Sequence, residues 1–300
     1  MSSVTANQSA GINQKRTSTK KNKNRKGENV GIPVRKLGQN YGEDVPLLWF
    51  GDNSLLSALF AGFSAVLVSV EDQLVYSARL YQDKVTDPIL KEQIRAFIGQ
   101  EAHHSREHEA FNRALIERGF KLQGIIKFTS KMNKWARKRQ SPADQLANAV
   151  CAEHFTALLA DYALRSDFLN HIPEPAKKLW AWHAIEEIEH KNVIFDMYVQ
   201  LVGDRKRLHK TMKITLIMSI IVQFLIAVSL MKNSGNSQFG NFKMWREGFS
   251  FIRKMMKDMK SDYNDFFKPD YHPWDHNALD LLVESRKKWL DEETSWQTAS

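Results

Sequence analysis

The sequence predicts an all-α protein in which four helices form a bundle, with a long crossover between helices 2 and 3 and additional C-terminal helices. Of its 300 residues only 14 are Gly and 8 are Pro, and few runs alternate β-branched residues, which argues against strands. The hydrophobic fraction of 43% allows a sizeable core. Two runs rich in His and Glu, at 101–108 and 182–190, lie in segments of helical periodicity, and such runs are typical of bundles that bind metal between their helices.

The basic character of the chain is concentrated at its N-terminus. Residues 1–40 carry nine basic residues and one acidic residue, which accounts for nearly all of the net charge of +9. The remaining body is close to neutral, so its charge does not indicate a nucleic-acid enzyme. We expect residues 1–44 to be a disordered basic tail, because they contain almost no large apolar groups. The tail is either solvated or tethered to anionic lipid.

Two further domains are expected after the tail. Residues 45–205 should form the four-helix metal-binding bundle, and residues 206–300 the C-terminal helices. The single cysteine, Cys151, rules out an internal disulfide and suits a reducing compartment. No signal-peptide core accompanies the basic run. We therefore expect a cytoplasmic protein, with the inner face of the membrane as the alternative location.

The first bundle helix begins after Asp52 or Asn53, either of which can cap it. Residues 54–70 contain no charge, and a helix that is apolar on all sides is buried in a bundle or in lipid. Glu71 follows at its end. A carboxylate there is costly unless it is paired or metal-bound. Glu71 therefore favours the bundle and is a candidate ligand.

The second helix covers about 88–118, begins with an Asp-Pro pair and ends at a Gly. It carries Glu101, His104 and His108 at positions i, i+3 and i+7. These positions share one helical face. The helix is thus expected to present a carboxylate and two imidazoles to the same side.

The crossover that follows contains more than twenty residues and includes a basic amphipathic segment at 125–139. In ferritin-like bundles one such connection joins the two helical hairpins. The third helix covers about 142–167, with Ser141 as its cap. It carries Glu153 as a candidate ligand.

The fourth helix covers about 176–202. His183, Glu187 and His190 fall within about 60° of one another around its axis. Glu186 is about 100° from Glu187 but also within reach of the same face. It could therefore replace Glu187 as the ligand.

The stretch 214–231 contains no charge, with Lys210 and Lys213 before it and Lys232 after it. Its length meets the lower limit for crossing a bilayer. Three interpretations stay open: a helix buried against the bundle, a helix docked on a membrane surface, and a true span. A span would place residues 233–300 across the membrane from the rest of the chain, which counts against it.

An amphipathic helix is expected near 245–267, and a last helix at about 277–293. Between them lies an aromatic segment that contains His272 and His276. These histidines lack the helical Glu spacing of the other runs. We expect them in a turn packed on the bundle rather than among the ligands.

A single Glu-x-x-His is more often a solvated pair than a metal site. Two copies in separate helices, each with an additional aligned His and each preceded by an apolar helix with one Glu, predict a dinuclear site. Mixed carboxylate and imidazole ligands favour iron, with manganese or zinc as alternatives. The predicted ligands are Glu71, Glu101, His104, Glu153, His183, Glu187 and His190. His108 is a further ligand, a donor that orients a carboxylate, or a polar neighbour on the channel wall.

The same order of residues resembles the ferritin-like di-iron proteins. The additional His183 looks like the three-histidine variant of the p-aminobenzoate N-oxygenase group. Separately, the region from about Leu47 to Trp274 resembles a bacterial family labelled predicted metal-dependent hydrolases, through Trp182-His183, Glu186-Glu187, Glu189-His190 and the His272-Pro273-Trp274 turn. The departure from the usual ligand set is His108.

These observations and resemblances suggest a di-iron enzyme that activates dioxygen to oxidise an apolar or lipid-like substrate. One iron would be held by Glu71, Glu101 and His104. The other would be held by Glu153, Glu187, His190 and His183, with Glu101 and Glu187 as bridges. Glu101, Glu187 and His108 are the catalytic candidates.

The alternative function is a hydrolase that uses metal-bound water on an ester or phosphoester. A third is a protein that stores or senses iron. The expected partners are an apolar or lipid-like small molecule and an electron donor that the sequence does not identify. A membrane surface and a second copy of the chain are open alternatives, and no nucleic acid is expected.

Overall fold

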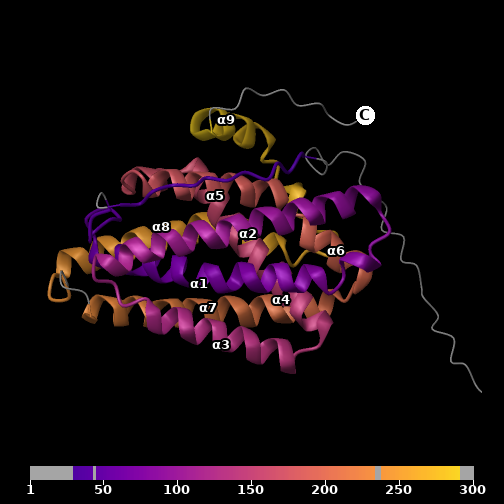
Figure 1. Ribbon diagram of the computed structural model, residues 1–300, viewed down its shortest axis with the longest axis horizontal. Coiled ribbons are helices and arrows are strands. Elements are labelled where there is room, and N and C mark those ends of the chain that lie inside the picture. Colours follow the sequence, from indigo (N-terminus) through magenta and orange to yellow (C-terminus); the bar gives the residue numbers. More distant parts are fainter. Residues whose placement is uncertain (1–29, 43–44, 234–237, 291–300) are drawn as a thin grey trace, which may run out of the picture.

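The computed structural model describes residues 30–42, 45–233 and 238–290. These residues form α-helices and short 3-10 helices, and no β-strand occurs among them. The predicted all-α fold is confirmed (Figure 1).

Four long helical segments make up the centre of the molecule. The first pair is α1 (Ser54–Arg79) and α2 (Pro88–Glu117), which pack on each other. The second pair is α4 (Pro142–Arg165) and α5 (Ala176–His190), and α6 (Val193–Leu201) continues from α5. α1 also contacts α4, and α2 contacts α5 and α6. The two pairs therefore face each other across a shared interior.

The starts of these helices are fixed by the residues that the sequence marks as caps. The Asn53 side chain accepts a hydrogen bond from the Leu56 amide at the start of α1. Asp87 and Ser141 cap α2 and α4 in the same way, each followed by a proline. Gly119, after the end of α2, adopts φ +106°, which a side chain would disfavour.

Two helices differ from the prediction. α1 continues to Arg79, so Glu71 lies inside the helix rather than at its end. Burial of Leu74 and Ala78 stabilises this extension. The fourth predicted helix is divided at Lys191 and Asn192 into α5 and α6. At this point the Lys191 ammonium donates to His276 O and the Asn192 side chain accepts from Trp274 Nε1.

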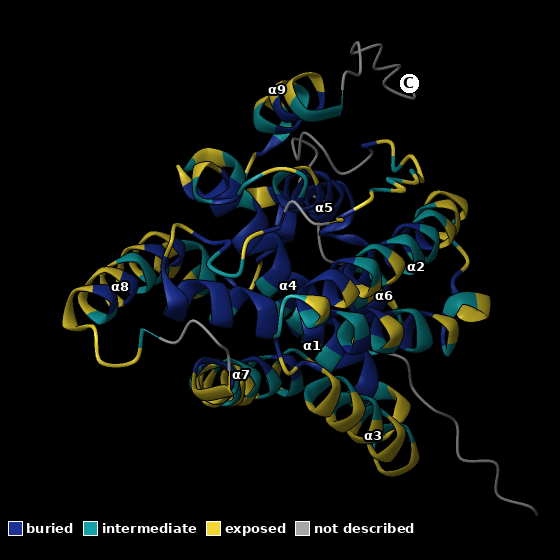
Figure 2. Ribbon diagram, turned by 60° about the vertical axis from the view of Figure 1, so that its left-hand side comes forward, coloured by how far each residue is buried: buried dark blue, intermediate teal, exposed yellow. Residues whose placement is uncertain are grey.

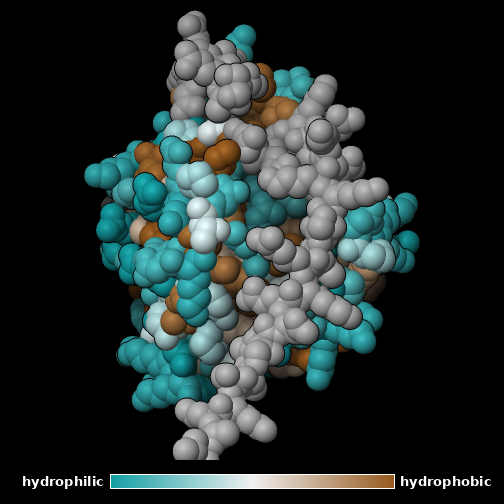
Figure 3. Space-filling model, turned by 90° about the vertical axis from the view of Figure 1, so that its right-hand side faces the viewer, coloured by the Kyte–Doolittle hydropathy of each residue, from teal (hydrophilic) through white to brown (hydrophobic). Residues whose placement is uncertain are grey.

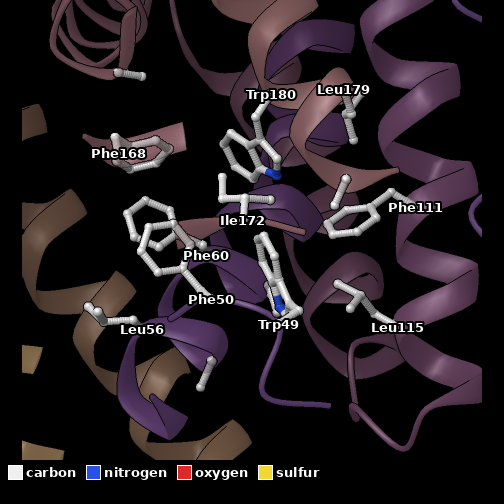
Figure 4. Close-up of a cluster of buried hydrophobic side chains, with 14 of the residues drawn as sticks. Trp49, Phe50, Leu56, Phe60, Phe111, Leu115, Phe168, Ile172, Leu179 and Trp180 are labelled. Carbon is white, nitrogen blue, oxygen red and sulfur yellow. The ribbon is translucent and has the colours of Figure 1, made fainter. Parts of the chain in front are cut away.

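Two apolar cores lie at opposite ends of this bundle. One is rich in aromatic residues and includes Trp49, Phe60 and Trp180 (Figure 4). The other includes Leu74, Ile94, Phe97, Val150 and Tyr198. Each of the four helical segments runs from one core to the other, and its buried glutamates and histidines fall between them. The polar residues are therefore held midway along the bundle.

The remaining helices surround the bundle. α3 (Gln123–Arg139), within the predicted crossover, packs on α1. α7 (Arg205–Asn233) packs on α1 and α4, and α8 (Phe242–Asp265) on the same two helices. α9 (Leu279–Leu290) packs on α5, and residues 291–300 lie outside the described range.

Two of the described helices are long and apolar enough to cross a membrane by length and composition alone, which is weak evidence of a span. The first, which contains α1, is 72% buried in its apolar window, as expected of a core helix. The second is α7, whose window is only 17% buried. Figure 2 shows α3 and α7 with mostly exposed or half-buried residues. The interpretation of 214–231 as a buried helix is therefore wrong for most of its length.

Residues 30–42, assigned above to the basic tail, lie on the bundle along α5 and α2 (Figure 1). Val30 and Tyr41 are buried, and the Tyr41 hydroxyl donates to Glu107. The tail prediction was wrong for this segment because a compositional argument cannot detect partners that lie far away in the sequence. Residues 1–29 and 43–44 lie outside the described residues.

Candidate metal centre

Side chains from four helices meet midway along the bundle. α1 and α4 each contribute one glutamate, α2 a glutamate and a histidine, and α5 a glutamate and two histidines. All of them are buried. They are the seven residues predicted as ligands: Glu71, Glu101, His104, Glu153, His183, Glu187 and His190.

The ligand atoms of these residues form three overlapping groups, each with its atoms within 4.8 Å of one another. Two groups share no residue, and the third has a residue in common with each of them. This arrangement is the one expected of two neighbouring cation positions. The groups are Glu71, His104 and His183; Glu101, Glu153 and His190; and Glu101, His104 and Glu187.

Eight buried polar atoms of the cluster have no hydrogen-bond partner among the described residues. Buried polar atoms in folded proteins are normally paired, and an unpaired buried carboxylate costs several kcal/mol. The cluster therefore fits a set of cations better than it fits the protein alone. The eight atoms are both carboxylate oxygens of Glu71, Glu101 and Glu153, Nδ1 of His104 and Nε2 of His190.

The distances agree with this interpretation. His190 Nε2 lies 3.1 Å from Glu101 Oε1, 3.4 Å from Glu153 Oε2 and 3.6 Å from Glu187 Oε2. Two ligands that bind one cation at about 2.1 Å and at right angles are about 3 Å apart. His104 Nδ1 lies 3.8 Å from oxygens of both Glu101 and Glu187. One small cation could therefore contact His190 and its neighbouring carboxylates together.

The electrostatics of the chain without metal show the same need for positive charge. Burial, with repulsion from Glu101, raises the pKa of Glu71 well above its usual range. Burial likewise raises the pKa of Glu153 well above its usual range. Burial acts to lower the pKa of His190, but Glu153 and the other nearby carboxylates outweigh it and raise that pKa well above its usual range. Protons thus occupy positions that cations could take.

His104 is oriented by a carboxylate behind it. Its Nε2 lies 3.0 Å from Glu186 Oε2, and Glu186 in turn accepts from the Arg35 guanidinium at 3.0 Å. A donor bond from Nε2–H to Glu186 leaves the Nδ1 lone pair facing the cluster. Glu186 therefore fixes the tautomer of His104.

His190 is oriented in the same way by an amide. Gln100 Nε2 donates to Glu189 at 2.7 Å, so Gln100 Oε1 faces His190 Nδ1, at 2.9 Å, as an acceptor. In the neutral ring the His190 Nε2 lone pair would then be directed into the cluster. Glu189 also accepts hydrogen bonds from Arg35, at 2.9 Å, and from Arg286, at 2.6 Å. Arg35 thus supports both histidines through different carboxylates.

His108 lies behind His183. Asn112 Nδ2 donates to Ser64 O, which leaves Asn112 Oδ1 to accept from the Ser64 hydroxyl. Ser64 Oγ must then accept from His108 Nδ1–H, at 2.8 Å. Burial lowers the pKa of His108 well below its usual range, so its Nε2 carries no proton and accepts from His183 Nδ1–H at 2.7 Å.

This chain of hydrogen bonds leaves the lone pair of His183 Nε2 facing Glu187 Oε1, at 2.8 Å. In the chain without metal a proton must join these two groups, and binding of a metal cation would release it. His108 uses both ring nitrogens and belongs to none of the three groups. His108 therefore orients the imidazole of His183, whereas the role expected of it was a donor that orients a carboxylate.

The structure separates residues that the sequence could not. Glu187 lies in the cluster, whereas Glu186 contacts Arg35 and the outer nitrogen of His104. His183 is grouped with Glu71 and His104, not with the Glu153 side as expected. Its ring also stacks on that of His104, with centroids 4.1 Å apart.

His272 and His276 lie outside the three groups. His272 Nε2 is 3.0 Å from Asp196 on α6, and its ring contacts Phe195. The aromatic turn therefore packs on the bundle.

Several functional contacts were not predicted. Of the missed residues, only Gln100 and Glu189 had a signal in the sequence, because each stands next to a predicted ligand. Glu186 was considered only as a ligand in place of Glu187. Nothing in helical spacing could have indicated a contact from the N-terminal segment or from the last helix. The missed residues are Arg35, Ser64, Gln100, Asn112, Thr156, Glu189 and Arg286.

A narrow pocket of about 20 Å³, room for about one water molecule, lies against His183 and Glu187. Thr156 is the other polar residue of its lining, and its hydroxyl donates to Glu187. The rest of the wall is apolar, and Figure 4 shows two of its aromatic members, Phe168 and Trp180. The pocket therefore offers apolar surface with one polar end at the cluster.

Comparison with known proteins gives one match. A family model described as predicted metal-dependent hydrolase matches residues 33–277. No curated protein and no solved structure matches the chain.

Proposed function

Because the chain belongs to the family described as predicted metal-dependent hydrolase, we propose that it is an enzyme whose bundle holds two divalent cations. The observation that carries this proposal is the convergence of four buried glutamates and three buried histidines between two apolar cores, with eight of their ligand atoms lacking a hydrogen-bond partner among the described residues. The proposed ligands are the seven residues of the cluster. The family match covers all of them and also covers Arg35.

The first candidate reaction is hydrolysis of an ester or phosphoester, as the family description favours. Bound zinc or manganese would supply Lewis acidity and lower the pKa of water. The pocket would have to widen to admit a substrate, whose hydrocarbon part would then lie on the apolar wall with the bond to be broken at the polar end, beside Glu187. The Thr156 hydroxyl, which donates to Glu187, is placed to donate to a substrate oxygen instead.

The second candidate is dioxygen-dependent oxidation of an apolar substrate. Two observations favour it: the four carboxylates of the cluster, and a pocket whose wall is apolar except at the cluster. Iron bound by mixed carboxylate and imidazole ligands would supply the electrons. The chain would exclude water and hold a C–H bond of the substrate next to His183 and Glu187.

Metal substitution tests the proposal. The purified protein is stripped of metal and reloaded without oxygen, with zinc, manganese or ferrous iron. Hydrolysis of long-chain esters by the zinc or manganese form in anaerobic buffer supports the first candidate. Oxygen uptake by the ferrous form, coupled to an oxidised apolar product, supports the second.

A matched control separates the pocket from the metal centre. Ala163 lines the pocket and is not one of the proposed ligands. Ala163→Leu should raise KM or abolish turnover while two cations stay bound. A purified chain that binds no metal under any of these conditions would contradict both candidates, and redox cycling of iron without any product would favour storage or sensing.

A further inference from the structure

The outer face of α7 is apolar and open. Seven of its large apolar side chains are 41–61% exposed. At 100° per residue they cover a sector of about 160°. A face of this size is unusual for a protein that is surrounded only by water. The seven are Ile214, Ile217, Met218, Ile220, Ile221, Phe224 and Leu225.

The apolar face extends onto neighbouring helices. α3 and α7 both pack on α1, and both lie on the same side of it in Figures 1 and 2. α3 adds exposed Phe128, Met132 and Trp135. On the other side, the ring of Phe224 contacts Phe249 of α8, with centroids 6.4 Å apart. In all, 13 of the 15 exposed large apolar side chains in the described residues belong to α3, α7 or the start of α8 with the residues before it.

The same surface is strongly basic. α3 and α7 together contain twelve Lys and Arg residues and neither Asp nor Glu. On α3, exposed Lys127, Lys131 and Lys134 alternate with the exposed apolar residues. On α7, Lys213 and Lys232 flank the uncharged stretch and are both exposed. An apolar strip bordered by cations is complementary to a bilayer surface with anionic headgroups.

α7 cannot cross a bilayer while it keeps these contacts. Its inner face is bound to the bundle along its length: Met212 lies in one apolar core, Leu230 in the other, and Gln223 between them donates to Leu59 O at 2.7 Å. The helix runs along the bundle rather than projecting from it (Figure 1). By contrast with the surface of α3 and α7, the visible part of the end of the molecule in Figure 3 is mostly hydrophilic, and its apolar atoms lie in separate small groups.

We propose that the α3–α7 face docks on the surface of an anionic lipid bilayer, with α7 parallel to the membrane plane. The apolar side chains of α7 would enter the boundary between headgroups and acyl chains, and the lysines of α3 and α7 would contact lipid phosphates. A symmetric contact with a second copy is disfavoured, because it would bring two basic surfaces together. The proposal does not depend on which reaction the metal centre performs.

Vesicle flotation with the full chain tests it. We expect the protein to float with vesicles of phosphatidylcholine and phosphatidylserine, and only weakly with phosphatidylcholine alone. Ile217→Asp with Leu225→Asp should reduce the bound fraction about tenfold or more, as should Lys131→Glu with Lys134→Glu. The matched control is Ile89→Asp, since Ile89 on α2 is similarly exposed, at 54%, and lies outside the face.

Circular dichroism melting of each variant shows whether it is folded. If the Ile217→Asp, Leu225→Asp variant has lost its fold, Ile217→Ser with Leu225→Ser takes its place. If both double variants bind the vesicles as well as the wild type does, the proposal is overturned. Binding that disappears when residues 1–29 alone are removed would overturn it too. A wild-type dimer that fails to float and becomes monomeric in the Ile217→Asp, Leu225→Asp variant would assign the face to a second copy instead.

Discussion

Substitution of Arg35 by leucine should destabilise a site that lies 151 positions away in the sequence. Arg35 is 13% exposed and donates to Glu186 and Glu189, both fully buried. Removing one partner of a buried ion pair costs about 3–5 kcal/mol. Glu189 keeps its contact with Arg286 and Arg35 is slightly exposed, so we expect about 2–3 kcal/mol for Arg35→Leu.

The same substitution should weaken metal binding. Without Arg35, the carboxylate of Glu186 loses its support and orients His104 less well. Loss of such supporting partners typically lowers metal affinity about 10–100-fold. Urea unfolding gives the free-energy change, and metal content after dialysis against a graded series of chelator concentrations gives the affinity change. Arg113→Leu is the matched control: Arg113 is exposed on α2, and its replacement should change stability by no more than about 0.5 kcal/mol.

A second substitution tests the cause. Glu186→Gln in the Arg35→Leu background removes the uncompensated charge, so it should recover part of the lost stability. Loss of stability in Arg35→Leu with unchanged metal affinity would show that Arg35 only anchors its own segment. An Arg35→Leu protein as stable and as rich in metal as the wild type would refute the reasoning altogether.

Three other predictions can be checked on the same material. Glu187→Ala should lower metal content below one ion per chain, whereas Glu186→Ala should retain more than one ion, by elemental analysis. Burial raises the pKa of the Cys151 thiol, so this thiol should react with a thiol reagent only after unfolding. In the metal-free chain the raised pKa values of Glu71 and Glu153 mean that the folded state binds more protons than the unfolded state. Below about pH 6.5 the lowered pKa values of His104 and His108 act in the opposite direction, because the unfolded state protonates those rings. Stability by urea unfolding should therefore fall as pH rises above about 6.5, the ordinary value of histidine, and restored metal should remove that slope.

Helical spacing was enough to place the predicted ligands on four helices. Glu101 and His104 share a face by geometry alone, and so do His183 and Glu187. The choice between Glu186 and Glu187 was beyond this reasoning, because both lie near the His190 face and only their surroundings differ. The structure distinguishes their surroundings: the Arg35 guanidinium binds Glu186, whereas Glu187 lies in the cluster.

The errors in the fold have the same origin. Residues 30–42 looked too polar to fold, but Arg35 and Tyr41 meet carboxylates on α5 and α2. An uncharged run such as 214–231 has the same composition whether its surroundings are protein or lipid. Its exposure depends on how much of its surface α1 and α4 can cover, and the burial along α7 shows that they cover only one side.

The charges of the described residues also bear on how many cations the centre should hold. Glu186 and Glu189 are matched by Arg35 and Arg286. Among the described residues the four glutamates of the cluster form no ion pair with an arginine and face histidines instead. One divalent ion would leave two buried negative charges, which must then be protonated or uncompensated. Two divalent ions neutralise all four and free each imidazole to act as a neutral ligand, so the charge balance of the chain favours a pair of cations over a single one.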